Sequence, residues 1–164
     1  MKYPIGIQEF EKIIKGDYVY VDKTALIYRL VTEGSIYFLS RPRRFGKSLL
    51  VSTLEAYFQG RKDLFKGLAI DELETEWVEH PVFHISFGGE NCIEQGALES
   101  KITTAFNKWE ELYGKSPNPT TFGGRFLYTL QAAHQKTGKR VVVLVDEYDK
   151  PLLDVLDTGY STKI

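Results

Sequence analysis

Continuous apolar runs alternate with amphipathic stretches along this chain. Residues 36–39 (Ile-Tyr-Phe-Leu) and 141–145 (Val-Val-Val-Leu-Val) are short apolar runs, and residues 82–87 form a third strand candidate that ends at Gly88 and Gly89. A run such as 141–145, which is mostly β-branched, is typical of a strand buried on both faces of a parallel sheet. The pattern therefore predicts at least three strands, two of them with almost no polar residues.

Apolar residues recur at helical spacing between these runs. Asp22 is placed to cap the start of one expected helix, and Gly34 is placed to end it. We expect helices over residues 7–15, 23–32, 46–58, 93–113, 121–136 and 151–156, an extended piece at 18–21, and short helical pieces within 61–80. Strands that alternate with helices predict a layered α/β fold with a mainly parallel sheet.

A basic loop, residues 40–48, follows the first apolar run and reads Ser-Arg-Pro-Arg-Arg-Phe-Gly-Lys-Ser. Strand, loop and helix, with glycine, lysine and serine at the helix start, is the arrangement of a phosphate-binding loop, because backbone N–H groups at a helix start attract anions. Lys47 would face the β- and γ-phosphates, and the Ser48 hydroxyl would ligate Mg²⁺. The motif G-x-x-x-x-G-K-[ST] is matched only in its second half, since Arg41 occupies the first glycine position.

Three arginines cluster in this loop, at positions 41, 43 and 44. A solvated loop and a nucleic-acid contact are the alternative interpretations. We favour neutralisation of phosphate, because the planar guanidinium fork matches phosphate oxygens. The predicted nucleotide-binding residues are Arg43, Arg44, Phe45, Gly46, Lys47, Ser48 and Leu49.

Two carboxylates follow the second apolar run, namely Asp146 and Glu147. Open α/β sheets bind ligands at the carboxyl ends of their parallel strands, which is where these acids lie. Asp146 would hold Mg²⁺, through a water molecule, and Glu147 would polarise the attacking water as a general base. The plainer alternative is a strand that ends in solvated acids. The predicted metal ligands are thus Ser48 and Asp146, and the predicted catalytic residues are Lys47 and Glu147.

Composition narrows the class of protein. The chain has 164 residues, 43% hydrophobic and 26% charged, with a net charge of −1 and one cysteine. These values predict one soluble cytoplasmic domain with no membrane partner and no disulfide framework. His80 and His84 make a poor metal site, because a spacing of four brings two side chains together on a helix and not on a strand.

Three motifs, in this order, carry a family resemblance. They are residues 20–24 (Tyr-Val-Asp-Lys-Thr), 38–50 (Phe-Leu-Ser-Arg-Pro-Arg-Arg-Phe-Gly-Lys-Ser-Leu-Leu) and 145–151 (Val-Asp-Glu-Tyr-Asp-Lys-Pro). Together they resemble the AAA-ATPase-like family of prokaryotic P-loop proteins, over nearly the whole chain. The resemblance implies that Arg41 is the usual residue at its position and that residues 21–24 are a hallmark whose role the sequence does not supply.

The same resemblance implies a P-loop NTPase-type three-layer αβα domain over residues 1–164, with its C-terminal part in the rest of a longer protein. It further implies ATP and Mg²⁺ as cofactors, with Lys47 and Ser48 in the Walker A loop and Asp146 and Glu147 in the Walker B position. Members of the family often carry a PD-(D/E)xK-type nuclease domain, which is how nucleic acid becomes a candidate partner.

The function expected from these residues is ATP binding in a Mg²⁺-dependent ATPase that drives or gates a separate effector. A non-hydrolysing nucleotide-sensing or interaction module is one alternative. The ATPase part of a nuclease-linked protein that processes nucleic acid is another. A P-loop kinase is disfavoured, because adjacent aspartate and glutamate suit the activation of water. The sequence leaves assembly into a homo-oligomer open.

Overall fold

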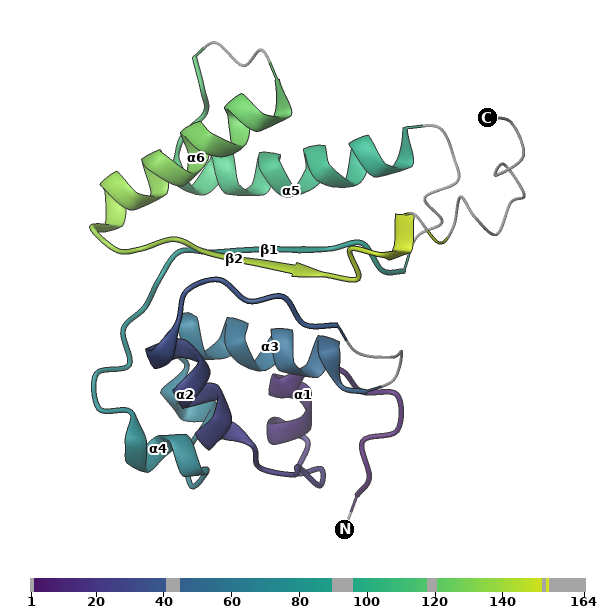
Figure 1. Cartoon of the computed structure of the whole chain (residues 1–164), viewed down its shortest axis with the longest axis vertical. Coiled ribbons are helices and arrows are strands. Elements are labelled where there is room, and N and C mark those ends of the chain that lie inside the picture. Colours follow the sequence, from purple (N-terminus) through teal and green to yellow (C-terminus); the bar gives the residue numbers. More distant parts are fainter. Residues whose placement is uncertain (1, 41–44, 90–95, 118–120, 152, 154–164) are drawn as a thin grey trace. The chain divides into compact units, whose positions relative to one another are not determined.

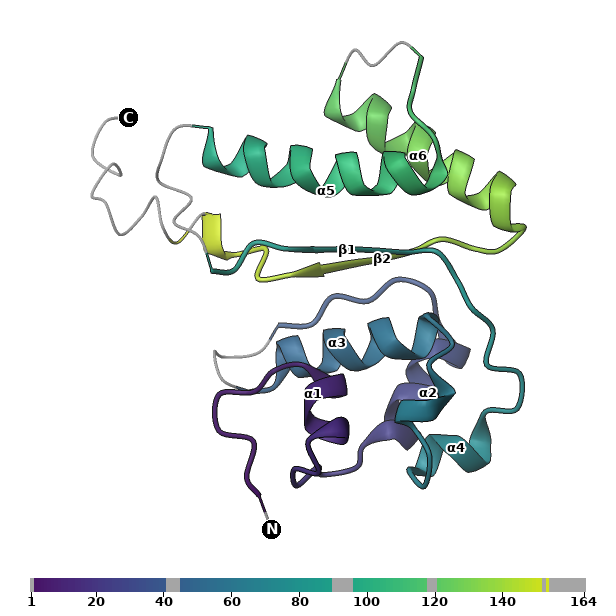
Figure 2. The same cartoon turned by 180° about the vertical axis from the view of Figure 1, so that it is seen from behind.

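The computed structural model describes residues 2–40, 45–89, 96–117, 121–151 and 153. The chain divides into two compact units, Met1–His80 and Pro81–Ile164, and each is described by itself. Figures 1 and 2 show the elements of both units from opposite sides. No described helix is long and apolar enough to cross a membrane.

All the named elements in the described part of the first unit are helices. Its elements are α1 (Phe10–Lys15), α2 (Thr24–Glu33), α3 (Lys47–Phe58), the 3-10 helix η1 (Lys62–Leu64) and α4 (Ala69–Leu73). Helix α1 packs against α3, and α2 packs against α4. The backbone N–H of Phe10 donates to the Ser52 hydroxyl at 2.9 Å, so a hydrogen bond connects the start of α1 to the middle of α3.

Aromatic side chains fill the core of the first unit. Phe10 and Phe65 are completely buried, with their ring centroids 4.8 Å apart. Trp77 lies 5.1 Å from Phe65 and 5.8 Å from Tyr57, also between centroids. Burial raises the pKa of the Tyr57 hydroxyl, and its hydrogen bond to the Glu74 carboxylate raises it further. Tyr57 therefore stays a neutral donor that links α3 to the residue after α4.

A polar brace joins the starts of α2 and α4. One carboxylate oxygen of Asp22 accepts from the backbone N–H of Thr24 at 2.8 Å and from its hydroxyl at 2.7 Å, and the other accepts from the N–H of Ala69 at 2.7 Å. The Thr24 hydroxyl, completely buried, accepts from the N–H of Ile70 at 3.0 Å. Backbone N–H groups at two helix starts thereby find acceptors in one sequence motif. These bonds give residues 21–24 a structural role.

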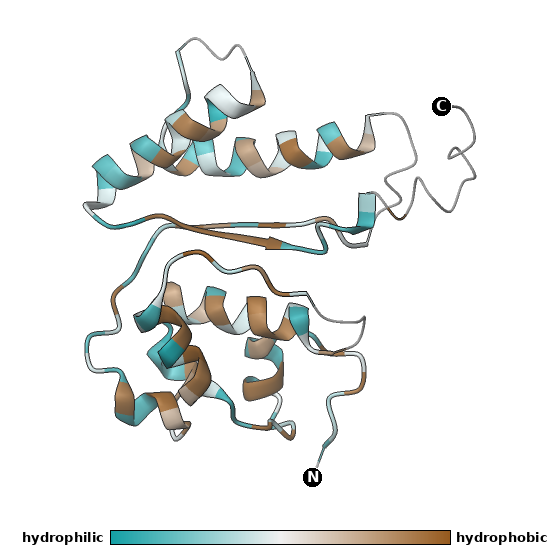
Figure 3. Cartoon of the chain, in the orientation of Figure 1, coloured by the Kyte–Doolittle hydropathy of each residue, from teal (hydrophilic) through white to brown (hydrophobic). Residues whose placement is uncertain are grey.

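The second unit contains a parallel strand pair with two helices on one face. Its elements are β1 (Val82–Ser86), α5 (Ala97–Tyr113), α6 (Phe122–Thr137) and β2 (Val142–Asp146). The register pairs Val82 with Val142 and Ser86 with Asp146. Figures 1 and 2 both show α5 and α6 on the same side of the two strands. Both strands are hydrophobic along most of their length, as Figure 3 shows.

The core of the second unit is centred on Phe83. Its ring is completely buried and stacks on Trp109 of α5 at 4.6 Å, and Phe126 of α6 also contacts this cluster. Helices α5 and α6 are further joined by an ion pair between Glu110 and Arg125, in which Arg125 Nε donates at 2.8 Å and Nη2 at 2.9 Å. The hydrogen bonds from Arg125 lower the pKa of the Glu110 carboxyl, which is only 5% exposed.

Most expected elements are confirmed, and two expectations are wrong. Residues 36–39 form no strand, and their side chains are mostly exposed, with Ile36 at 92% and Phe38 at 75%. The 141–145 run is a parallel strand, but Val143 and Val145 keep 43% and 44% of their surface, so it is not buried on both faces. Apolar composition indicates that a segment favours burial, whereas actual burial requires a partner that the pattern does not specify. In the segment expected to be extended, residues 18–21, Tyr18 forms an isolated β-bridge with Lys2.

Several predictions fall on residues outside the described ranges. The first part of the helix expected over 93–113 is one of them, since α5 is described from Ala97. The greater part of the helix expected over 151–156 is another, as are the arginines of the basic loop.

Removal of the Asp22 carboxylate should destabilise the first unit. We expect Asp22→Ala to lower the free energy of unfolding by about 1 kcal/mol, the usual contribution of an N-cap, because Asp22 is too exposed for a larger charge effect. Burial raises the pKa of Asp22, but hydrogen bonds from Ala69 and Thr24 outweigh it and hold that pKa below its ordinary value. The stabilisation should therefore be present above about pH 4 and be lost as the pH falls through the lowered pKa.

Urea unfolding at neutral and acidic pH measures this effect. Glu72→Ala is the matched control, because Glu72 is an exposed acid in the same helix that Asp22 braces. Two results would contradict the proposed role of Asp22. One is an equal loss of unfolding free energy in both variants at pH 7. The other is a loss in Asp22→Ala that is still present at pH 3.

The Glu110–Arg125 pair predicts a larger effect. Arg125→Met should cost about 3–5 kcal/mol, because it leaves the buried Glu110 carboxylate without its partner. The double variant Arg125→Met/Glu110→Gln should recover most of this loss, since it removes the buried charge as well. Arg29→Met is the control: the Arg29–Glu33 pair is exposed and should contribute less than about 1 kcal/mol. Equal losses at the two sites in urea unfolding would contradict the assignment.

Candidate functional site

Helix α3 begins with the backbone geometry of an anion-binding loop. Gly46, its N-cap residue, has φ +75°, in the left-handed region that favours glycine. A Cβ built on Gly46 would meet nothing within 4 Å, so the backbone angle, and not lack of space, requires glycine there. The first N–H group with an intrahelical acceptor is that of Leu50, which donates to the Gly46 carbonyl at 3.0 Å. The N–H groups of Lys47, Ser48 and Leu49 therefore precede the first hydrogen bond of the helix.

The side chains of this first turn suit an anion. Lys47, Ser48 and Leu49 are half-buried, and the turn carries no acidic residue. Phe45, just before it, is 64% exposed. Glycine at the N-cap has no side-chain oxygen, so it does not occupy the N–H groups as serine or aspartate would. Among the described residues these N–H groups have no acceptor, so the helix start combines backbone donors, a lysine and a hydroxyl, which is the set that phosphate and its metal require.

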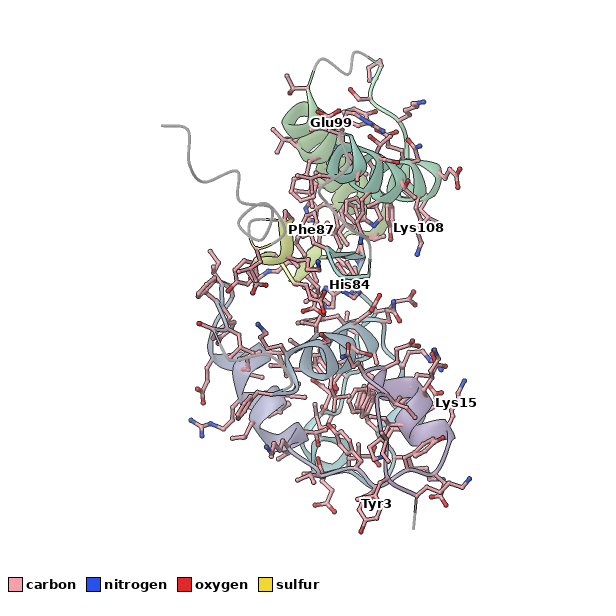
Figure 4. The ribbon with its side chains drawn as sticks, turned by 90° about the vertical axis from the view of Figure 1, so that its right-hand side faces the viewer. Tyr3, Lys15, His84, Phe87, Glu99 and Lys108 are labelled. Atoms are coloured by element: carbon pink, nitrogen blue, oxygen red, sulfur yellow. The ribbon has the colours of Figure 1, made fainter. Side chains whose placement is uncertain are left out.

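The second candidate group lies at the end of β2. Asp146 is 8% exposed, and its Oδ1 accepts from the N–H of Glu147 at 2.9 Å. Its carbonyl accepts from the N–H of Phe87 at 3.0 Å, which extends the parallel ladder one step past the register pair Ser86–Asp146. Figure 4 labels Phe87, the residue directly after β1, and His84 within β1. A nearly buried carboxylate at the end of a strand suits contact with a cation.

Glu147 does not continue the strand. Its φ is +52°, in the left-handed region, and its carbonyl accepts from Lys150 N–H at 3.0 Å in a tight turn. A non-glycine residue in this region carries a strain of about 1–2 kcal/mol, and such strain collects at functional sites. The turn, and not strand alternation, therefore sets the direction of this side chain. Its carboxylate lies against Gly88 in the turn that follows β1.

The described residues of the predicted site belong to two different units. Phe45 to Leu49 belong to the first unit, and Asp146 and Glu147 belong to the second. Arg43 and Arg44, predicted to neutralise phosphate, lie outside the described residues. Within the described ranges, no three histidine, cysteine, aspartate or glutamate side chains gather as a metal site. The Mg²⁺ ligands Ser48 and Asp146 therefore stay a prediction.

Sequence reasoning missed Gly88, which lies beside Glu147, and Lys101, which bonds to Gly88. Gly88 provides the space that the carboxylate occupies, and Lys101 of α5 donates to the Gly88 carbonyl at 2.5 Å. The only sequence signal was the Gly88-Gly89 pair, which we interpreted as the end of a strand. Nothing in the pattern marked Lys101, because a lysine on a surface helix is ordinary.

Comparison with known proteins identifies the family. A family model described as "Predicted AAA-ATPase" matches residues 4–164, and the chain belongs to this family. A relative from Azotobacter chroococcum mcd 1, described as "Uncharacterized protein in vnfD 5'region", is 48% identical over 157 residues. The match covers 94% of this chain and 30% of that relative, so the chain spans under a third of the relative's length. No solved structure matches the chain significantly.

The left-handed backbone at Glu147 makes a prediction about stability. Glu147→Gly should be more stable than Glu147→Ala by about 1 kcal/mol, because only glycine adopts this angle without strain. At Lys108, on the exposed side of α5, the order should reverse by a similar amount, since glycine weakens a helix interior. Thermal and urea unfolding of the four variants checks this. Alanine as the more stable residue at both positions would show that Glu147 is not strained.

Proposed function

We propose that this chain is the ATP-binding domain of a Mg²⁺-dependent ATPase that drives or gates a separate effector. The observation that carries the proposal is the start of α3, where a left-handed Gly46 is followed directly by Lys47 and Ser48. Membership of the predicted AAA-ATPase family supports nucleotide binding independently. The parallel β1–β2 pair with helices on one face supports a P-loop NTPase-type αβα sandwich as the complete fold.

The proposed chemistry assigns one task to each residue. The N–H groups of the first turn of α3 would hold the phosphates, and Lys47 would neutralise the charge that develops on the γ-phosphate. Ser48 and Asp146 would hold Mg²⁺, which supplies charge stabilisation of the leaving phosphate oxygens. Glu147 would orient water and accept its proton. From the sequence, we further propose that Arg43 and Arg44 contribute positive charge to the phosphate site.

The effector is proposed to lie in the rest of a longer protein. This chain covers 30% of its Azotobacter relative, so a domain of this size accounts for a minor part of such a protein. ATPase domains commonly act on a separate part through a change in shape between nucleotide states. Non-hydrolysing nucleotide sensing is the second candidate, and it differs from the first only in whether Glu147 activates water.

Nucleotide binding and turnover in the intact protein test the proposal. Lys47→Ala should weaken Mg-ATP binding roughly 10- to 100-fold, which corresponds to the loss of one charge-assisted contact. Lys66→Ala is the matched control, because Lys66 lies in the same unit outside the loop and should bind as wild type does. Titration calorimetry measures both constants. Wild-type affinity in Lys47→Ala would refute the assignment of the loop.

Glu147→Gln separates the two candidate functions. The variant should bind Mg-ATP with unchanged affinity and release phosphate at least about 100-fold more slowly, because an amide does not accept the proton of the attacking water. Turnover equal to wild type removes Glu147 from the role of base. Binding without turnover in the wild-type protein identifies a nucleotide sensor.

A further inference from the structure

The turn that follows β1, residues 86–89, lies beside the end of β2. The backbone N–H of Gly88 donates to the Ser86 hydroxyl at 3.2 Å, and Phe87 is bonded to Asp146 through the backbone. These bonds connect the turn both to its own strand and to the residue before Glu147. The position of the turn relative to Asp146 and Glu147 is therefore set by one backbone–backbone bond and one bond to a hydroxyl, both within the second unit.

Gly88 leaves a space that the Glu147 carboxylate occupies. A Cβ built on Gly88 would lie 2.6 Å from Cδ of Glu147 and 3.2 Å from Oε1, and nearer still to Oε2. Carbon atoms in contact normally lie about 3.5–4.0 Å apart, so no larger side chain is compatible with this arrangement. The three nearest atoms all belong to Glu147. At Gly89 the situation is the opposite: φ is +85° and the surrounding space is open, so backbone angle and not space favours glycine there.

A lysine of α5 also bonds to this turn. Lys101 Nζ donates to the carbonyl of Gly88 at 2.5 Å, and the side chain is half-buried. Hydrogen bonds from a charged donor are short and roughly twice as strong as neutral ones. Lys101 thus restrains the peptide group against which the Glu147 carboxylate lies.

We propose that Gly88 and Lys101 are positioning residues for Glu147. Gly88 provides the space that the Glu147 carboxylate occupies. The hydrogen bond from Lys101 restrains the peptide group of Gly88. The inference deepens the proposed function and rests on it, because it assumes that Glu147 activates water. Neither residue touches nucleotide or water in this proposal; both act through Glu147.

Gly88→Ala should affect catalysis more than folding. The atoms that an added methyl group would meet are the far end of a flexible side chain, so the carboxylate is displaced while the backbone remains. A displacement of about 1 Å reduces turnover roughly 100-fold. We expect kcat for ATP to fall by about this factor while the affinity for Mg-ATP stays at its wild-type value. Gly123→Ala is the control, since the nearest atom to its Cβ, Thr121 Oγ1, is 4.0 Å away.

Lys101 offers a second kinetic test. Lys101→Met should lower kcat in the same direction, and Lys101→Arg should restore it, because arginine keeps a charged donor for the Gly88 carbonyl. Wild-type kcat in both Gly88→Ala and Lys101→Met, in a protein that hydrolyses ATP, would overturn the proposal.

A spectroscopic measurement is independent of turnover. In protein labelled with ¹³C at glutamate Cδ, the resonance of Glu147 is assigned by its loss in Glu147→Gln. It should shift in Gly88→Ala and stay in place in Gly123→Ala. An unchanged resonance in Gly88→Ala overturns the proposed contact. A shifted resonance in a protein without ATP turnover supports the contact and refutes the ATPase function, so the two failures are distinct.

Discussion

The parallel register of β1 and β2 is the constraint on which the rest of the second unit depends. It places Ser86 beside Asp146, and the next backbone bond, from Phe87 to Asp146, brings the turn after β1 to the residue before Glu147. The stack of Phe83 on Trp109 and the Glu110–Arg125 pair hold α5 against this strand pair. A slip of one residue would turn every side chain of a strand to the opposite face, so core packing and acid placement are specified together.

The two halves of the candidate site use backbone strain in different ways. At Gly46 the left-handed angle carries little strain, because glycine adopts it freely, and it directs free N–H groups from the start of α3. Glu147 adopts the same left-handed φ, which is strained for a residue with a side chain. The surrounding bonds therefore determine this backbone angle. The bonds of the turn after β2 hold this angle and thereby set the direction of the Glu147 side chain.

The first unit shows why a motif can be recognised without being understood. Residues 21–24 mark the family, yet their bonds serve the starts of α2 and α4 and are local to the helical unit. Asp22 was expected to cap the helix over 23–32; the N-cap residue of α2 is Lys23, and the Asp22 carboxylate accepts from the N–H of Thr24, the first residue of α2. Its second bond, to Ala69, was beyond prediction, because 47 residues separate the two positions in sequence. Hydropathy also misjudged 36–39, since an apolar segment becomes a strand only when another backbone pairs with it.

The sequence by itself determined the local structure and the candidate chemistry. Helix spacing, the glycine before Lys47 and the acids after 141–145 are properties of neighbouring residues, and short-range sterics and capping make them readable. Only the tertiary structure decided what lies beside Glu147. Gly88 and Lys101 come from a turn and a helix far from position 147 in sequence, and their roles follow from space and hydrogen bonding across elements. No periodicity in a single chain encodes such contacts, because they arise from the pairing of two strands.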